Sequence, residues 1–237
     1  MWFLLALSAL FVSANSASPT TVSVYYESLC PYCIDFIRDQ LAPAYYKIGD
    51  KIKVDLIPFG NGDVDEVNGK LIFICQHGES ECYANRIQAC ALDLGVGNSG
   101  IEFALCAMSS SNPSSEEILK QCAIDHKIDW DQIENCYQSK KADDLLMEYA
   151  NRTISVSPPI LGTPAIALDN HYMETLTDIA QMSLQETIEF LQSGGTCYWC
   201  KYGMELSYLT ENPAMNIYTC KNYSSTYETP NLNKSIY

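Results

Sequence analysis

Two cysteines separated by two residues, Cys30 and Cys33, are the side chains of this sequence best suited to chemistry. They follow a β-branched and aromatic segment at 22–26, which predicts a strand, and they precede apolar residues at helical spacing. A cysteine in the first turn of a helix faces unpaired backbone N–H groups and the positive end of the helix dipole, which lower the pKa of its thiol. This arrangement predicts that Cys30 attacks a disulfide as a thiolate and that Cys33, one turn later, resolves the mixed disulfide.

Other interpretations of this pair stay open at the level of sequence. A CxxC can form half of a zinc site, but no second CxxC or CxxH follows at the usual spacing, so we expect no metal. Each cysteine could instead belong to a structural disulfide, or the spacing could be a coincidence in a chain with 11 cysteines. The order strand, CxxC, helix favours a redox dithiol over these alternatives.

The two ends of the chain bear on its compartment. Residues 2–11 form an apolar run that is too short to span a bilayer, and small residues follow it, so residues 1–17 are predicted to be a cleaved signal peptide. No later segment is long and apolar enough for a membrane span, and the many cysteines predict disulfides formed in the secretory pathway. The sequence has three predicted N-glycosylation sites, Asn151, Asn222 and Asn233.

The charge balance excludes some classes of partner. The chain has 14 basic and 29 acidic residues, which gives a net charge of −15. Nucleic acids and anionic membrane surfaces repel such a chain, so we expect neither as a partner. The acidic residues are scattered, and partial protonation in an acidic organelle would reduce their mutual repulsion, which is consistent with a lysosomal location.

The apolar pattern predicts one α/β domain over residues 20–195. A strand at 22–26, a helix from Cys33 that Pro43 kinks or ends, and a buried strand at 52–59 make a βαβ unit with the dithiol at its first turn. Short amphipathic helices then follow up to about residue 150. The other expected elements are a short strand at 71–74, a hairpin of 165–168 and 171–173 with Asp169-Asn170 at its turn, and a helix at about 176–191 that stops at Gly194-Gly195.

This order resembles the thioredoxin fold with a disulfide-rich helical insertion at about 75–150. In that fold the proline before the third core strand is cis and packs against the dithiol. Thr163 and Pro164 match this position, so the resemblance implies a cis bond there. An ordinary trans proline in a turn is the alternative, because most X–Pro bonds are trans.

Residues 75–90 carry a more specific resemblance. They match the signature C-Q-H-G-x2-E-C-x2-N-x4-C of the gamma-interferon-inducible lysosomal thiol reductase family. Pro58-Phe59-Gly60-Asn61 and the CxxC are also similar to that family, and the resemblance covers most of residues 22–192. The specified positions of the signature are Cys75, Gln76, His77, Gly78, Glu81, Cys82, Asn85 and Cys90.

The family resemblance implies reduction of disulfides in protein substrates within acidic endosomes and lysosomes, with Cys30 and Cys33 as the active-site cysteines. Pro31-Tyr32 differs from the glycine-containing pairs of vertebrate members, which leaves the redox potential and the substrate preference open. The signature itself has no assigned catalytic role. His77 either tunes the charge of the site, because its own charge changes near endosomal pH, or hydrogen-bonds within a disulfide-rich turn.

The cysteines outside the CxxC number nine, so at least one is free or pairs with another chain if the rest form disulfides. We therefore expect a monomer or a disulfide-linked dimer. Cys197 and Cys200 form a second CxxC without a preceding strand, so residues 196–237 are predicted to be a Cys/Tyr-rich tail with disulfides or a processing site. The disulfide candidates are Cys75, Cys82, Cys90, Cys106, Cys122, Cys136, Cys197, Cys200 and Cys220.

The sequence thus predicts a thiol reductase without a bound cofactor, which an external thiol must regenerate, in endosomes or lysosomes or outside the cell. Its expected partners are disulfide-containing proteins. A secretory-pathway oxidase or isomerase would use the same two cysteines and differ in reduction potential. A secreted, non-catalytic binding protein is the alternative of another class. Cys-Pro-Tyr-Cys is also similar to the active site of cytosolic glutaredoxins, but the signal-like N-terminus, the chain length and the other cysteines argue against that class.

Overall fold

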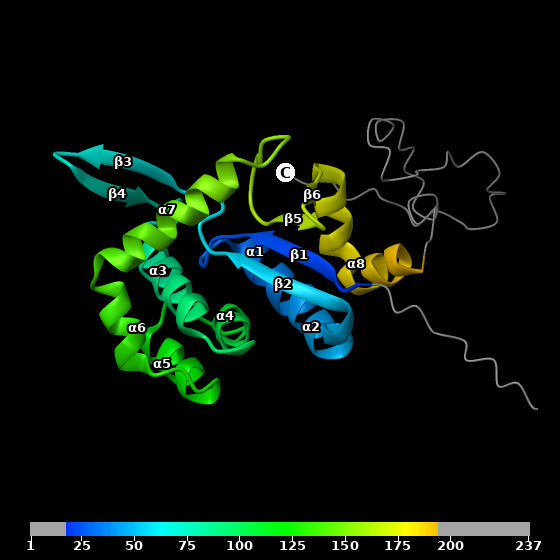
Figure 1. Cartoon of the computed structure of the whole chain (residues 1–237), viewed down its shortest axis with the longest axis horizontal. Helices are drawn as coiled ribbons and strands as arrows, with labels where there is room; N and C mark the ends of the chain where they lie inside the picture. The colour runs from blue at the N-terminus through cyan, green and yellow to red at the C-terminus, as the bar shows by residue number, and fades with distance from the viewer. Residues whose placement is uncertain (1–17, 194–237) are drawn as a thin grey trace, which may run out of the picture.

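The computed structural model describes residues 18–193 and is built around a mixed four-stranded sheet with the strand order β2-β1-β5-β6 (Figure 1). The central strand β1 pairs in parallel with β2 and antiparallel with β5, and β6 extends the other edge. Strands β1 and β5 are buried almost throughout, because helices cover both faces of the sheet. The strands are β1 (Thr20–Tyr25), β2 (Ile52–Ile57), β5 (Ala165–Leu168) and β6 (His171–Tyr172).

One face of the sheet packs against the first helical segment and the last helix. Val22 and Val24 of β1 belong to this core, together with Phe36, Leu41 and Ile188. The first segment comprises α1 (Pro31–Phe36), the π-helical turn η1 (Ile37–Leu41), α2 (Ala42–Ile48) and the short 3-10 turn η2 (Gly49–Lys51), and the last helix is α8 (Glu174–Gln192).

The first helical segment contains a proline, Pro43, at a change of helix type. Pro43 is near the start of α2, directly after the π-helical turn, and proline lacks the N–H that a regular helix interior needs. The helix predicted to kink or end at Pro43 instead continues through α2, and the chain changes from a π-helical turn to an α-helix just before the proline. Helix α8 also has an irregular residue, Ser183, and the next backbone N–H, that of Leu184, donates to Gln40 Oε1 at 3.3 Å.

The other face packs against an insertion between β2 and β5, which Figure 1 shows beside the sheet. Disulfides join its short helices: Cys90–Cys136 links α3 to α6, and Cys106–Cys122 links α4 to α5. The helices are α3 (Glu79–Leu94), α4 (Ser99–Met108), α5 (Glu116–Asp125), α6 (Trp130–Tyr137) and α7 (Lys140–Ile154). The predicted thioredoxin-like fold with a disulfide-rich helical insertion is confirmed.

The strand predicted at 71–74 is present, but it lies outside the core sheet. It forms β4 (Lys70–Ile74) of a separate hairpin with β3 (Asp63–Val67). Asn68 and Gly69 have positive φ angles of 54° and 75° at the turn, as a two-residue hairpin turn requires. Asp169 and Asn170, with φ angles of 49° and 64°, make the corresponding turn between β5 and β6.

Several predictions from the sequence fall outside residues 18–193 and stay predictions. They concern the signal peptide at 1–17 and the tail from residue 196, with its three cysteines and the glycosylation sites Asn222 and Asn233. Within the described part of the chain, no helix combines the length and the apolar character needed to cross a membrane.

Gly60 lies where β2, the end of β1 and the loop before β5 approach one another. Its N–H donates to Tyr26 O at 3.0 Å, and a Cβ added there would lie 2.7 Å from the Thr163 side chain and from backbone atoms of Tyr25 and Tyr26. We predict that Gly60→Ala lowers the free energy of unfolding by about 1–3 kcal/mol because of this overlap, measured by urea denaturation.

The matched control is Gly49→Ala. Gly49 has helical φ and ψ angles of −59° and −25°, and a Cβ there would meet no atom within 4 Å. We expect unchanged or slightly higher stability for this variant, by up to about 1 kcal/mol. Equal stability of the two variants would contradict the proposed crowding at Gly60.

Candidate active site

Cys30 is the N-cap residue of α1, at the end of the loop that leads out of β1. Its carbonyl accepts a hydrogen bond from Ile34 N–H at 3.0 Å, and Pro31 occupies the first helical position, where its missing N–H costs nothing. Cys30 is 5% exposed and Cys33 is fully buried, and both are free thiols. The sulfur of Cys30 is therefore the one of the pair that lies nearer to the solvent.

The loop before β5 lies against Cys30. The Thr163–Pro164 peptide bond is cis, and the Cys30 thiol donates to the Thr163 carbonyl at an S···O distance of 3.6 Å. The Thr163 hydroxyl lies 3.8 Å from the same sulfur and can donate to it. Residues that are 133 positions apart in the sequence thus form one site.

The two thiols differ in acidity. Hydrogen bonding from Cys33 lowers the pKa of Cys30 to about 6 in spite of burial, and the Thr163 hydroxyl and the charge of His77 act in the same direction. Burial raises the pKa of Cys33 well above its ordinary value, and the shared hydrogen bond with Cys30 raises it further. The site therefore holds Cys30 as a thiolate at a pH at which Cys33 keeps its proton.

A buried carboxyl group that the sequence did not reveal, Glu27, completes the inner part of the site. Its Oε2 lies 3.3 Å from the Thr163 hydroxyl, whose one proton is donated either to this oxygen or to the Cys30 sulfur. Its Oε1 has no hydrogen-bond partner among the described residues. Burial, then the negative charges of Glu81 and Cys30, raise its pKa to about 7. Nothing in the local pattern singles out Glu27, because an acidic residue in a strand-to-helix loop is usually exposed.

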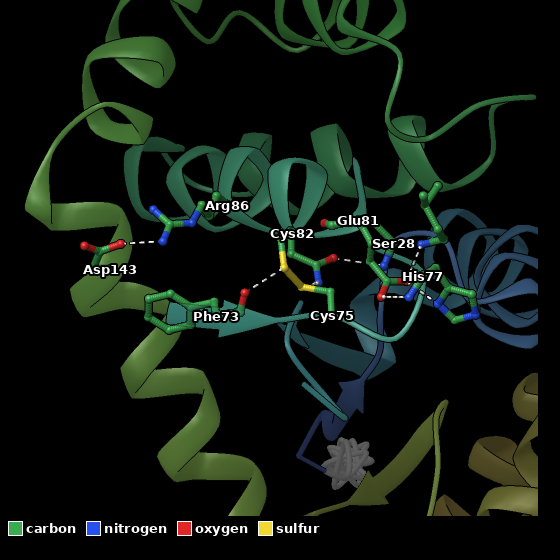
Figure 2. The surroundings of a disulfide bond; sticks show 10 residues. Ser28, Phe73, Cys75, His77, Glu81, Cys82, Arg86 and Asp143 are labelled. Carbon is green, nitrogen blue, oxygen red and sulfur yellow. Dashed lines mark hydrogen bonds and ion pairs between the residues drawn. A yellow bond between two sulfur atoms is a disulfide. The ribbon is translucent and has the colours of Figure 1, made fainter. Parts of the chain in front are cut away.

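His77 hydrogen-bonds within the disulfide-rich turn and also affects the charge of the site, so both of its expected roles have support. Its Nδ1 lies 2.6 Å from Glu81 Oε2, and its backbone N–H donates to Glu81 Oε1 at 3.1 Å (Figure 2). The side-chain ligand atoms of Glu27, His77 and Glu81 all lie within 4.8 Å of one another, and these residue types can bind a divalent cation. The carboxylate of Glu81 is already engaged by His77, and the thiol chemistry below uses no ion.

Six of the nine predicted disulfide candidates form three disulfides in the described part of the chain. Cys75–Cys82 joins the segment before α3 to its first turn, as Figure 2 shows, in addition to the two disulfides between helices. Cys197, Cys200 and Cys220 lie outside the described residues. Asn151 is exposed on α7 and accessible to a glycan, and the modification itself stays a prediction.

The fold and the site define a dithiol oxidoreductase of the thioredoxin-like class. The oxidised form of BdbD from Bacillus subtilis is similar with a TM-score of 0.54 and 16% sequence identity, over 76% of this chain and 91% of that chain. A thioredoxin-like oxidoreductase from Silicibacter pomeroyi gives a TM-score of 0.51 and 15% identity, over 74% of this chain and 88% of that chain. At these identities the likeness shows the shared fold alone.

The sequence comparisons narrow the class to a family. The family model "Gamma interferon inducible lysosomal thiol reductase (GILT)" matches residues 21–126. A gamma-interferon-inducible lysosomal thiol reductase of Carassius auratus is 33% identical over 192 residues, which are 80% of this chain and 75% of that protein. A lysosomal thiol reductase-like protein of Anopheles gambiae is 30% identical over 197 residues, 78% of this chain and 82% of that protein. The chain belongs to the gamma-interferon-inducible lysosomal thiol reductase family and is a thiol-disulfide oxidoreductase.

The acidity of Cys30 gives a direct prediction. With a pKa of about 6, Cys30 should react with iodoacetamide along a titration curve centred near that pH, whereas Cys33 should stay unreactive. Alkylation of the reduced protein, quantified for each cysteine by peptide mass spectrometry across a pH series, checks this. A midpoint for Cys30 near about 8.5, the value of an ordinary thiol, would contradict the lowered pKa of Cys30.

Glu27 should make stability depend on pH. Because its pKa is raised from the ordinary value of 4.5 to about 7, the folded state binds more protons than the unfolded chain between these values. The free energy of unfolding is therefore highest below a pH of about 4.5. It falls by on the order of 2 kcal/mol as the pH rises through about 7. Urea denaturation of the oxidised protein, in which Cys30 does not titrate, measures this slope.

Glu27→Gln should remove most of that slope, whereas Glu66→Gln, at an exposed carboxylate on β3, should preserve it. If Glu27→Gln and the unsubstituted protein lose stability equally between about pH 4.5 and about pH 7, the carboxyl group of Glu27 does not hold its proton as inferred.

Proposed function

We propose that this protein reduces disulfide bonds of protein substrates, with Cys30 as the nucleophile and Cys33 as the resolving thiol. The observation that supports this most directly is the asymmetry of the pair beside the cis-Pro164 loop. Cys30 has a lowered pKa and lies nearer to the solvent, whereas Cys33 has a raised pKa and is fully buried. A thiolate attacks disulfides and a thiol does not, so the two cysteines are suited to successive steps.

The first step forms one bond and breaks one bond. The Cys30 thiolate attacks one sulfur of the substrate disulfide, a mixed disulfide forms, and the other substrate sulfur leaves as a thiolate. In the second step Cys33 loses its proton to the substrate thiolate that left in the first step, and the resulting Cys33 thiolate attacks the Cys30 sulfur. The second substrate thiolate is then released, and two electrons have passed from the Cys30–Cys33 pair to the substrate.

A further turnover needs an external thiol, because the Cys30–Cys33 disulfide must be reduced again by two electrons. We propose a small thiol as this reductant and no bound cofactor. Glu27 is neutral below a pH of about 7 and therefore adds no second negative charge beside the Cys30 thiolate in acidic solution. This arrangement favours thiolate chemistry at low pH.

An acidic endosome or lysosome, or the exterior of the cell, is the location that we propose. The predicted signal peptide, the three disulfides and the family support the secretory pathway. At about pH 5, a thiol with a pKa of about 6 is roughly 10% thiolate, against roughly 0.03% for an ordinary thiol. A difference of about three hundredfold lets the reaction proceed where most thiols are inactive.

Substrates would approach along the exposed surface beside Cys30. A groove of about 280 Å³ runs past Pro164 and is lined by Tyr32, Leu161, Thr163 and Glu174. Tyr32 is 69% exposed and offers an aromatic surface to a substrate segment. We propose disulfide-containing proteins as the partners, and no nucleic acid, because the net charge is −15.

The oligomeric state that we propose is a monomer or a dimer linked through the tail. Cys30 and Cys33 are the free cysteines within residues 18–193, and the other six there are paired. Any cysteine left over from the odd number is therefore Cys197, Cys200 or Cys220.

An oxidase or isomerase is the second candidate, and one observation favours it. A lowered pKa of Cys30 stabilises the reduced dithiol, which by itself makes the disulfide form a better oxidant. The family relationship supports the reductase instead. A binding protein without catalysis is disfavoured, since both cysteines and their environment are intact.

The test is reduction of insulin disulfides at about pH 5 and about pH 7, with free cysteine as the reductant. Cys30→Ser should abolish the activity, because no other described free thiol is accessible. Cys33→Ser should instead accumulate a mixed disulfide with insulin at Cys30, detected by non-reducing electrophoresis and peptide mass spectrometry. Turnover that persists in Cys30→Ser, or no trapped complex in Cys33→Ser, would overturn the assigned roles.

A further inference from the structure

The loop that leads into Cys30 is fastened to a buried polar stripe on α3. Glu81, Asn85 and Gln88 lie on one face of this helix at the spacing i, i+4, i+7, and all three are fully buried. A helix face that packs into a core is ordinarily apolar, because burying polar groups costs free energy unless they are hydrogen-bonded. The stripe therefore has a specific set of partners.

Those partners are three residues of the loop 26–29. The Tyr26 hydroxyl donates to Gln88 Oε1 at 2.6 Å. The Ser28 N–H donates to Asn85 Oδ1 at 2.9 Å, and the Leu29 N–H donates to Glu81 Oε2 at 3.1 Å. In addition, the Ser28 hydroxyl donates to the Glu81 carbonyl at 3.2 Å (Figure 2).

The hydrogen bonds from Ser28 N–H and Leu29 N–H supply acceptors for two backbone groups of the loop. Neither N–H has another acceptor among the described residues. Ser28 is fully buried, so its N–H would be left without a hydrogen-bond acceptor, at a cost in free energy, if Asn85 could not accept from it. The next residue after Leu29 is Cys30 itself. A shift of this loop would move the Cys30 sulfur away from Thr163 and from the first turn of α1.

The segment before α3 is itself held in place. The Cys75–Cys82 disulfide closes the turn that contains His77, and His77 contacts both oxygens of the Glu81 carboxylate. The Asn85 amide lies 4.0 Å from the Cys75 sulfur. Cys75, His77, Glu81, Cys82 and Asn85 therefore form one connected unit. Asn85 Oδ1 and Glu81 Oε2 of this unit accept hydrogen bonds from the loop before Cys30.

We propose that Glu81 and Asn85 are positioning residues for thiol-disulfide exchange, and that the 75–90 signature acts as a clamp on the loop 26–29 that fixes the sulfur of Cys30. The proposal rests on the proposed function for its importance in turnover. It deepens that function by giving the signature, which lies outside the dithiol, a physical role in the reactivity of Cys30.

The test compares variants of Asn85, because changing Asn85 to another neutral residue alters no charge near the thiol. The charged and titratable groups around Cys30, namely Glu27, Cys33, His77 and Glu81, stay the same. Asn85→Leu keeps the number of non-hydrogen side-chain atoms and cannot accept a hydrogen bond. We expect its Cys30 alkylation midpoint to rise by at least about half a pH unit, and its alkylation rate at about pH 5 to fall at least about threefold.

Asn85→Asp serves as the rescue variant. Burial beside Glu81 favours the protonated form of this new carboxyl group at about pH 5, so it stays neutral and keeps an acceptor oxygen in the same position. Its alkylation rate at that pH should stay within about twofold of the unsubstituted protein. A loss as large as that of Asn85→Leu would mean that Asn85 matters for packing alone.

Arg86→Met is the matched structural control on the same helix. It removes the ion pair between Arg86 and Asp143 Oδ1, 2.5 Å long, which ties α3 to α7 away from the loop (Figure 2). It should lower the melting temperature without moving the Cys30 midpoint. If Asn85→Leu also lowers the melting temperature and leaves the Cys30 midpoint unchanged, Asn85 is structural and the proposal is overturned.

A second variant and a readout independent of activity separate loss of folding, loss of function and loss of the clamp. Should Asn85→Leu not fold, Asn85→Ala removes the same acceptor without adding apolar atoms and is held to the same result. The alkylation measurement does not depend on insulin reduction, so a protein inactive on insulin would refute the proposed function while still testing the clamp.

Discussion

The sulfur of Cys30 lies where three segments that are distant in the sequence meet: the first turn of α1, the loop before β5 and the loop held by α3. Each segment supplies a different part of the stabilisation of the thiolate. The helix start offers backbone N–H groups and the Cys33 thiol, the Thr163 hydroxyl lies beside the sulfur, and α3 holds the approach to Cys30 in place. Without this meeting point, a buried thiol would keep its proton, because burial alone raises its pKa.

The electrostatics of the site suit an acidic environment. Cys30 ionises near a pH of about 6, whereas Glu27 keeps its proton up to about 7. Over this interval the Cys30 sulfur carries a negative charge, while the carboxyl group of Glu27 beside it is neutral. At higher pH, Glu27 would add a further buried negative charge, which repels the thiolate and the departing substrate thiolate. The same carboxyl group that costs stability at neutral pH thus limits repulsion at acidic pH.

Local signals in the sequence were sufficient for the dithiol, for the βαβ unit around it and for the short helices with their cysteines. The position of Pro164 came from the resemblance to the thioredoxin fold, and the structure places it beside Cys30. The helical spacing of the α3 residues also predicted a helix at this point. The dithiol, the βαβ unit and the helices depend on residues close together in the chain and on motifs, and both can be recognised in a single sequence.

The remaining features depend on tertiary contacts that no local pattern encodes. Glu27 is buried because α3 and the loop before β5 cover it, and the partner of each cysteine in the insertion depends on how the helices pack. The strand at 71–74 pairs in its own hairpin, since its partner at 63–67 reads as a polar loop. In the sequence, the polar stripe of α3 appears only as specified positions of a family signature. Its role follows from its hydrogen bonds to the loop 26–29, which only the three-dimensional structure shows.

The central claim is that the Cys30 thiolate reduces substrate disulfides at acidic pH. A single-turnover reaction at about pH 5 tests it most directly. Reduced protein and an equimolar protein disulfide are mixed without any other thiol, and the redox state of each cysteine is read by mass spectrometry. Formation of the Cys30–Cys33 disulfide together with two new substrate thiols is the expected result. Transfer in the opposite direction, with oxidised protein converting substrate thiols to a disulfide while the reduced protein leaves the substrate intact, would contradict it.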